Sequence, residues 1–293
     1  MKASRVPEIY FRKDYEDLGF EIIRLESFLE RRGKILQTSP HRIRFYAMLF
    51  IEEGEGVHYI DFKRLTLGKG SLLFIGKDQV HAWNRWTGIT GYIVLFTERF
   101  LYRNQVQFHD LSYTYPYNAN LYSPKLETCG RPVFDVLALL LPLMHAEYIS
   151  RNTSGQGESL QCLLRFLILK IRSTMEPGRN FEDEKMKSLF ILFQKALDQN
   201  LSVTRNVSDY CTLLKVSYHR LNRTVKRLTQ KTAKAFIDDM LILEAKRHLA
   251  EKAINTSEIS YVLGFEEPTN FTKFFKKYTG KTPKYFRDSL NSS

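Results

Sequence analysis

The feature that most constrains how this chain folds is a short helix–turn–helix pattern that occurs twice near its C-terminal end. The first occurrence places apolar residues at helical spacing over 207–215 and over 217–230, with a brief turn between the two helices. The same order returns about 46 residues later over 257–265 and 269–280, and a longer predicted helix over 233–253 joins the two. We therefore predict an all-α C-terminal domain built from two helix-turn-helix units.

The second helix of each pattern has a residue that favours a helix boundary and a face that is polar or basic. Ser217 stands where its hydroxyl can accept a backbone N–H at the start of the helix over 217–230. Gly280 and then Pro283 predict the end of the helix over 269–280. The residues left to face outward are His219, Asn222, Arg223, Lys226 and Arg227 in the first unit, and Thr269, Thr272, Lys273, Lys276 and Lys277 in the second.

These outward side chains suit recognition of double-stranded DNA. Asn can pair with adenine and Arg with guanine in the major groove through two hydrogen bonds each, while Lys and Arg near a helix end suit phosphates. Two such helices about 34–36 Å apart could enter successive major grooves on one face of the duplex. The expected partner is therefore double-stranded DNA. For Arg223 and Lys273, the alternative interpretation is a solvated charge.

The charge distribution agrees with a polyanionic partner for the C-terminal part of the chain. The 293 residues carry a net charge of +12. From Glu184 onward the chain holds 20 of the 44 Lys and Arg but only 11 of the 32 Asp and Glu, a net charge of +9. The rest of the chain carries only +3. Net charge indicates a class of partner and says nothing about the fold.

The chain before the C-terminal domain is rich in predicted strands. Short apolar runs separated by Gly-containing turns, from RIRFYAMLFI at Arg42 to GYIVLF at Phe96, predict an antiparallel sandwich or barrel. Two helices are predicted next, over 132–149 and 157–175. The second helix has an apolar stripe, from Leu160 to Ile171, that fits either an intradomain core or a dimer interface.

The polar stretch over 176–183 contains Pro-Gly and predicts a linker. The expected division is therefore 1–175, 176–183 and 184–293, with the first forty residues unassigned. We find no signal-peptide pattern and no apolar run long enough for a membrane span. Three widely spaced cysteines make disulfides improbable and favour a reducing cytoplasm.

The C-terminal sequence resembles one known family. YVLGFEEPTNFTKFFKKYTGKTPKYFR closely resembles the second helix-turn-helix unit of the AraC/XylS-type regulators, and LILEAKRHLA resembles their linker helix. The resemblance implies a cytoplasmic, sequence-specific DNA-binding transcription regulator, usually an activator that works with RNA polymerase. It also implies base contacts from His219, Asn222 and Arg223 in the first unit, and from Pro268, Thr269, Thr272 and Lys273 in the second.

The first unit departs from the family pattern. Gln230 and Ala233 stand where the family usually has Gly and a following Pro, and Val225 occupies the usual Phe position. In the second unit, Pro268 offers no polar side-chain contact. We therefore expect the first unit to specify the DNA sequence and the second largely to anchor the chain to the duplex.

The strand-rich segment resembles the cupin-like sensing domain that often precedes this DNA-binding module, through GEGVHYIDFKRLTLGKGSLLFIGKDQVHAW. The expected fold class is thus α+β multidomain: an N-terminal cupin-like β-barrel with following helices, and a C-terminal all-α double helix-turn-helix domain. The resemblance implies that the barrel binds a small-molecule effector and that the following helices form a homodimer.

The candidate effector contacts are polar or aromatic residues of the predicted barrel. His81 and Trp83 alternate along one strand, so their side chains face the same way. The preferred set is Tyr46, His58, His81 and Trp83, with His41 and Glu53 as further candidates. A hydrogen-bonded barrel histidine is the alternative for His58 and His81. Tyr59 and Ile60 follow His58 where a metal-binding cupin has its second His, so we expect no metal and no cofactor.

Two other functions remain as alternatives. The first is a barrel enzyme or DNA-repair protein with an appended DNA-binding module. Cys129, in LETCGRP, has no His near it in sequence to activate a thiol, so we expect no enzyme. The second is a non-specific nucleic-acid or scaffold protein, which would not need an ordered double motif.

Overall fold

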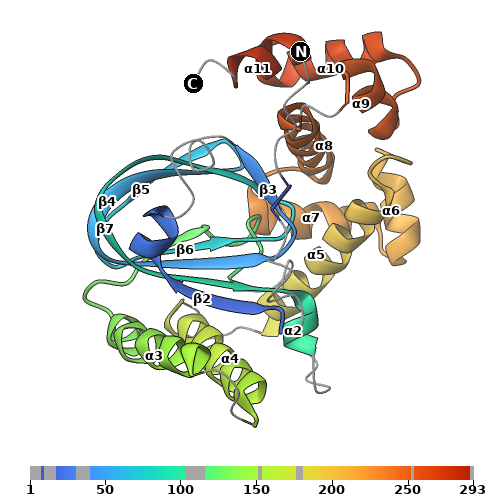
Figure 1. Cartoon of the computed structure of the whole chain (residues 1–293). Helices are drawn as coiled ribbons and strands as arrows, with labels where there is room; N and C mark the ends of the chain where they lie inside the picture. The colour runs from blue at the N-terminus through green and yellow to red at the C-terminus, as the bar shows by residue number, and fades with distance from the viewer. Residues whose placement is uncertain are drawn as a thin grey trace. The chain divides into compact units, whose positions relative to one another are not determined.

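The computed structural model describes residues 8–9, 18–30, 40–102, 116–150, 154–175, 181–251 and 254–290. These residues form two compact units, one from the described residues up to Met175 and the other from Phe181 onward. Of the expected linker, 176–180 lie outside the described residues, and the first helix of the second unit already begins at Phe181. The chain thus has a sheet-rich unit followed by an all-helical one (Figure 1).

Two long strands, β4 (Tyr46–Ile60) and β7 (Val80–Phe96), form the backbone of the sheet and pair antiparallel along most of their length. The strand order is β1-β3-β7-β4-β6-β8, with β2 also paired to β7 and β5 to β4. The shorter strands are β1 (Glu8–Ile9), β2 (Phe20–Arg24), β3 (His41–Ile43), β5 (Lys63–Leu67), β6 (Ser71–Ile75) and β8 (Lys125–Glu127).

Both long strands bend midway, so each belongs to two parts of the sheet. One end of β4 pairs with β6 and the other with β5, while one end of β7 pairs with β2 and the other with β3. The β4–β7 register shifts between Ile51 and Glu53, which marks a bulge at the bend. Gly91, opposite Ile51, has a φ of 146°, and a Cβ there would lie 2.0 Å from the Phe50 carbonyl oxygen. The bend therefore needs glycine at this position.

Alternation along the bent strands divides the unit into two apolar cores. On β4, Ala47, Leu49 and Ile51 belong to the core inside the barrel. The alternate residues Tyr46, Met48 and Phe50 belong to a second core, which α3 and α4 complete. This two-residue period confirms the predicted antiparallel, barrel-like sheet.

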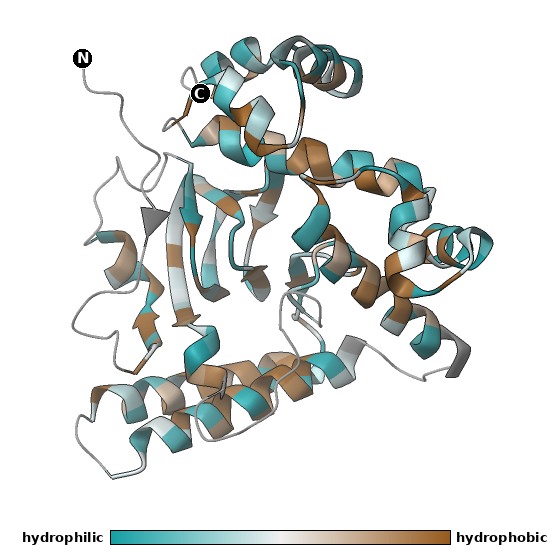
Figure 2. Ribbon diagram, turned by 90° about the vertical axis from the view of Figure 1, so that its right-hand side faces the viewer, coloured by the Kyte–Doolittle hydropathy of each residue, from teal (hydrophilic) through white to brown (hydrophobic). Residues whose placement is uncertain are grey.

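Two helices cover the outer face of the sheet next to the second core. They are α3 (Pro132–Ile149) and α4 (Gln156–Met175), and the short α2 (Glu98–Tyr102) follows β7. Hydrophobic residues run along both long helices (Figure 2). By length and composition alone α3 could cross a membrane, which is weak evidence because core helices pass the same test. Its residues Leu137 and Leu141 are fully buried in the core.

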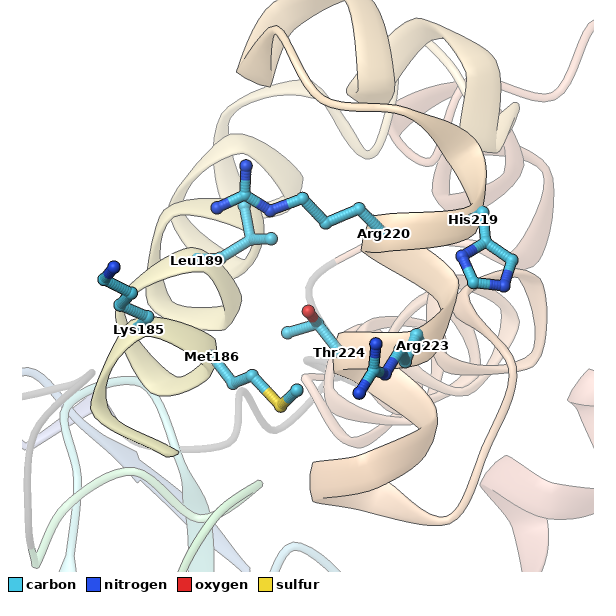
Figure 3. A pocket seen from close by; sticks show the side chains of 7 residues that line it. All are labelled: Lys185, Met186, Leu189, His219, Arg220, Arg223 and Thr224. Atoms are coloured by element: carbon cyan, nitrogen blue, oxygen red, sulfur yellow. The ribbon is translucent and has the colours of Figure 1, made fainter. Parts of the chain in front are cut away.

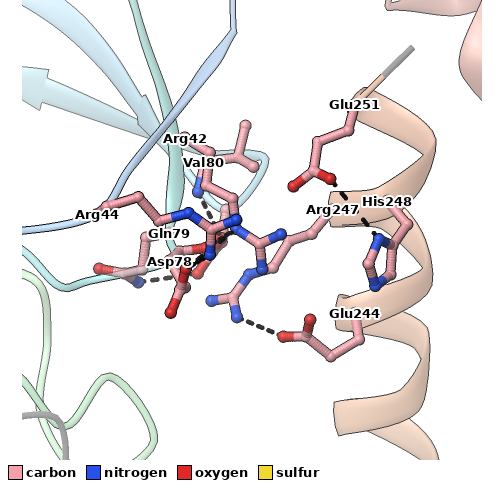
Figure 4. Close-up of polar contacts among 10 residues, drawn as sticks. Arg42, Arg44, Asp78, Gln79, Val80, Glu244, Arg247, His248 and Glu251 are labelled. Atoms are coloured by element: carbon pink, nitrogen blue, oxygen red, sulfur yellow. Dashed lines mark hydrogen bonds and ion pairs between the residues drawn. The ribbon is translucent and has the colours of Figure 1, made fainter. Parts of the chain in front are cut away.

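A half-buried polar turn joins β6 to β7. Asp78 has a φ of 68°, and its carboxylate pairs with the guanidinium groups of Arg42 and Arg44. Next to it, the Gln79 amide donates to Asp61 at 2.8 Å (Figure 4). These contacts fix the start of β7, the strand that carries His81 and Trp83.

The second unit consists of seven helices among its described residues. They are α5 (Phe181–Asn200), α6 (Val207–Leu214), α7 (Tyr218–Thr229), α8 (Ala233–Ala250), α9 (Thr256–Val262), α10 (Pro268–Thr279) and α11 (Pro283–Ser289). The pairs α6–α7 and α9–α10 are the two helix-turn-helix units, joined by α8. The sequence patterns predicted α6 to α10 but not α11, because Pro283 ends one helix and also begins the next at a position where its missing N–H is not needed.

The predicted helix boundaries are largely confirmed. The Ser217 hydroxyl accepts the Arg220 backbone N–H at 3.3 Å, and Gly280 ends α10 with a φ of 73°. Asn206 stands at the start of α6, but its side chain makes no capping hydrogen bond. Asn255 and Glu258 form a reciprocal capping box at the start of α9, which satisfies two backbone N–H groups.

Aromatic packing holds each helix-turn-helix unit to its neighbours. In the first unit, the ring of Phe193 on α5 contacts Tyr210 and Phe236. In the second, Phe271 and Phe275 are fully buried, and their rings pack together as their four-residue spacing predicts. On α8, Arg247 pairs with Glu244 at 2.5 Å, and His248 Nδ1 lies 3.7 Å from Glu251 Oε2; all four residues are half-buried (Figure 4).

Candidate functional site

The outer face of α7 is an exposed basic surface. The buried residues Leu221, Thr224 and Val225 fix its rotation against the core. The exposed side chains of this face are His219, Arg220, Arg223, Lys226 and Arg227. Arg220 was absent from the predicted site, although its spacing of three and seven residues from Arg223 and Arg227 places all three on one helical face. The face can present guanidinium donors to guanine edges or phosphates.

Asn222 is placed differently from the other predicted base readers. Its side chain is half-buried, and its Oδ1 accepts the backbone N–H of Ala233 at 2.9 Å. That N–H is one of the unsatisfied groups at the start of α8, so Asn222 ties α7 to the connecting helix. The periodicity that put Asn222 on the outer face could not reveal this contact, because the partner lies eleven residues away across a turn.

The outer face of α10 carries lysines and threonines. Thr269, Lys273, Lys276 and Lys277 are exposed. Thr272 is half-buried, and its hydroxyl donates to the Pro268 carbonyl oxygen at 3.0 Å. Because that hydroxyl is engaged within the helix, the face offers mostly ammonium groups, which act as point charges toward phosphates.

Two polar contacts hold the second helix-turn-helix unit, α9–α10, in place relative to the rest of the helical domain. The buried Asp238 of α8 accepts a hydrogen bond from the Tyr278 hydroxyl at 2.7 Å and pairs with Lys234 at 2.7 Å. Arg205, before α6, donates to the Leu263 carbonyl oxygen and lies 3.6 Å above the Phe265 ring. The hydrogen bond to Asp238 raises the pKa of Tyr278 to about 12.

Three histidines meet inside the barrel. His58 Nε2 and His81 Nδ1 lie 3.1 Å apart, and the His41 ring centroid lies 4.0 Å from that of His81. Trp83 packs edge-on against His58 at 4.6 Å, so the prediction that His81 and Trp83 face the same way is correct. Desolvation, aided by His41, lowers the pKa of the fully buried His58 to about 3. His58 is therefore neutral at ordinary pH and can donate or accept a hydrogen bond.

Tyr46 and Glu53 lie apart from these histidines. Tyr46 belongs to the core beneath α3 and α4, where its hydroxyl lies 3.1 Å from Glu98 Oε1. Glu53 is exposed and pairs with Lys69. The structure therefore brings His41, His58, His81 and Trp83 together and separates the other two candidates from them.

The histidine cluster is not arranged as a metal site. Within the part of the chain that the structure describes, no group of three or more His, Cys, Asp or Glu side chains could hold a metal ion. The His81 ring packs against the rings of His41 and His58, and the His58 ring packs against Trp83.

Two protein-family models match the chain, one in each unit. The model described as an AraC-like ligand binding domain matches residues 28–126, and the model described as a helix-turn-helix domain matches residues 210–289. The first match runs from before β3 into β8, and the second runs from within α6 to the end of α11.

Known proteins align with this chain over nearly their full length. The transcriptional activator RhaS of Yersinia pseudotuberculosis is 22% identical over 267 residues, covering 89% of this chain and 93% of its own. The activator RhaR of Mannheimia succiniciproducens is 22% identical over 88% of this chain and 90% of its own. The structure of ToxT from Vibrio cholerae aligns at 12% identity over 94% of this chain and 99% of that one, with a TM-score of 0.46. The chain belongs to the AraC/XylS-type family of DNA-binding transcription regulators.

Proposed function

We propose that α7 reads the DNA sequence and that α10 anchors the same chain to the DNA backbone. The observation that carries this is the contrast between the two outer faces. The face of α7 presents three arginines and a histidine at helical spacing, whereas that of α10 presents lysines beside short hydroxyl side chains. Arg pairs bidentately with guanine and Lys meets phosphate as a point charge. His219 and Arg223 are the proposed base contacts, and Lys226, Lys273 and Lys276 the proposed phosphate contacts.

The test is selection of binding sites from random double-stranded DNA, followed by titration of the selected site with two variants. Arg223→Ala should weaken binding by about 1–3 kcal/mol and relax the preference at one base position. Lys276→Ala should weaken binding of every sequence alike and reduce the salt dependence by about one phosphate contact.

Equal affinity for all sequences would contradict the proposal and favour a non-specific nucleic-acid protein. A variant Lys276→Ala that changes base preference, together with an Arg223→Ala that does not, would reverse the roles of the two helices. Asn222→Ala is the matched comparison on α7. It should lower stability through the lost contact with Ala233, whatever its effect on DNA binding.

The barrel is the proposed effector-binding part. Its histidine cluster combines an aromatic wall with polar nitrogen atoms, which is how small-molecule sites fix an orientation. His58 Nδ1 is fully buried and has no hydrogen-bond partner among the described residues, so a ligand hydroxyl or carbonyl would satisfy it. The effector we propose is a small polar molecule that contacts His58, His81 and Trp83.

A thermal-shift screen of small polar molecules against the full chain tests this assignment. A ligand that stabilises the native chain should lose its effect in His81→Ala and Trp83→Ala. It should keep its effect in Tyr46→Phe, because Tyr46 lies in the other core. An unchanged thermal shift in both His81→Ala and Trp83→Ala would contradict the assignment.

The remaining parts of the proposal concern assembly and output. Leu139 and Leu143 of α3 are 72% and 52% exposed, and Phe166 and Leu169 of α4 are 46% and 45% exposed. Together they would form an apolar face for a homodimer between α3–α4 pairs. We propose a cytoplasmic regulator that activates transcription, as the activators RhaS and RhaR do. We further propose that it works with RNA polymerase, and we assign no reaction to the barrel. Leu139→Glu with Leu143→Glu should shift sedimentation to that of a single chain.

A further inference from the structure

A cavity of about 300 Å³ opens between α5 and α7 within the helical unit. Its volume is at the lower end of the range for small-ligand sites, roughly 300–1,000 Å³. The lining residues are Lys185, Met186 and Leu189 of α5, and His219, Arg220, Arg223 and Thr224 of α7 (Figure 3). All of them lie on two helices that pack against each other through the core of this unit.

The cavity combines positive charge with an apolar wall. Lys185, Arg220 and Arg223 are exposed, and the Arg220 side chain extends from α7 toward α5 (Figure 3). Met186 points into the space between the helices, and the buried Leu189 lies beside it on α5. Arginine and lysine donate strong charge-assisted hydrogen bonds to a carboxylate or phosphate. The methionine can adapt to the shape of an apolar group.

This composition is more specific than a phosphate-binding surface. A DNA backbone phosphate needs cations on an accessible surface and gains nothing from the Met186 and Leu189 side chains. A ligand that carries one anionic group on a small apolar body would use both parts of the cavity. The class of ligand that fits the cavity is therefore an organic anion about the size of one ring.

We propose that this cavity binds a compact organic anion, a carboxylate or phosphate on a small apolar body, and that the bound anion competes with DNA for α7. Competition follows because His219 and Arg223 line the cavity and also belong to the proposed DNA-contacting face. The competition rests on the proposed function, whereas anion binding itself does not. By linkage, DNA must weaken anion binding by the same factor as the anion weakens DNA binding.

Binding is tested first without DNA. The full chain is titrated with benzoate, with benzyl alcohol as the neutral analogue and with inorganic phosphate as the bare anion, by ligand-observed NMR. Benzoate should bind saturably and more tightly than either comparison ligand. Arg220→Ala should weaken benzoate binding about tenfold, as expected for one charge-assisted hydrogen bond. Met186→Trp should abolish it by filling the cavity while every charge remains.

Lys187→Ala is the matched control, because it removes a cation from the same helix without lining the cavity. It should leave benzoate binding unchanged. The anion site is overturned if benzoate does not bind saturably, if Met186→Trp leaves its affinity intact, or if inorganic phosphate binds as tightly as benzoate. The last result would show that the cations bind phosphate without any contribution from the apolar wall of the cavity.

Competition is tested separately with the selected DNA site. Saturating benzoate should raise the apparent Kd of the wild-type chain for this DNA and leave that of Met186→Trp unchanged. If benzoate binds but does not weaken DNA binding, the competition is overturned while the anion site stands. If no DNA site can be selected, the proposed function fails, and the first titration still decides the anion site.

Discussion

Gln230 ends α7 in a left-handed backbone conformation with a φ of 61°, a region that side chains other than glycine enter at a cost. Its side chain is exposed, away from the core of the helical unit. We expect Gln230→Gly to raise the free energy of unfolding by about 0.5–1 kcal/mol, measured by urea unfolding followed by helical circular dichroism. Lys226→Gly, inside the same helix, should instead lower it by about 1 kcal/mol. A destabilising Gln230→Gly would refute the strain argument.

His58 makes the stability of the barrel depend on pH. Its pKa is lowered from 6.5 to about 3 in the folded chain, so between these values the unfolded chain binds the extra proton. The stabilisation is complete above pH 6.5 and is lost as the pH falls toward 3. The loss has a slope of up to about 1.4 kcal/mol per pH unit. His58→Gln should flatten this dependence.

The measurement is urea unfolding between pH 7 and pH 5, followed by tryptophan fluorescence. Both tryptophans of the chain, Trp83 and Trp86, lie on β7 and report on the barrel. His219→Gln is the control, because its side chain is exposed and on α7. If the free energy of unfolding falls with pH in the same way in the wild-type chain and in His58→Gln, the lowered pKa of His58 is contradicted.

Among the secondary-structure elements, α8 and α10 are joined by a hydrogen bond that the helical pattern did not predict. Tyr278 donates to the buried Asp238, 40 residues away. Tyr278→Phe should lower the free energy of unfolding by about 1–2 kcal/mol, because it leaves a buried carboxylate short of a donor. Urea unfolding followed by circular dichroism measures this. Tyr285→Phe, at a 59% exposed tyrosine on α11, should have almost no effect, and equal effects of both variants would contradict the role of the bond.

Local signals in the sequence predicted the helix-turn-helix elements well. Ser217, Gly280 and the Phe271–Phe275 pair act within one or two helical turns, where spacing alone fixes geometry. Asn222 shows the limit of this approach: its outward position followed from the helical period, but its hydrogen bond to Ala233 depends on how two helices meet.

The barrel was harder to predict because a sheet bulge changes the face on which a residue lies. Tyr46 and His58 are twelve residues apart on β4, so an unbroken two-residue period puts them on one face. The bulge between Ile51 and Glu53 exchanges the two faces. Before it, odd-numbered residues such as Leu49 face the barrel interior, and after it His58 and Ile60 do. Of the candidate effector contacts, Tyr46 therefore lies in the core beneath α3 and α4, whereas His58 and Trp83 lie inside the barrel.

For the whole molecule, the two units make a direct prediction about truncation. Each unit has its own buried core, and the helical unit contains both helix-turn-helix pairs. A fragment lacking residues 1–180 should keep the DNA sequence preference of the full chain and lose any response to a barrel-bound effector. Binding-site selection with the fragment and with the full chain measures this. Loss of sequence preference in a folded fragment would count heavily against the proposed domain division.

The two helices proposed to contact DNA lie on one chain and carry different side chains, arginines on α7 and lysines on α10. Two identical DNA-contacting helices related by a two-fold axis bind a palindrome equally well in either orientation. The two unlike helices of one chain have no such symmetry, so the half-site that each chain would occupy has a defined direction. Inverting that site within a promoter would keep the affinity and reverse the order in which the chain lies along the DNA. On the proposed roles of α7 and α10, the orientation of the half-site becomes part of the regulatory signal.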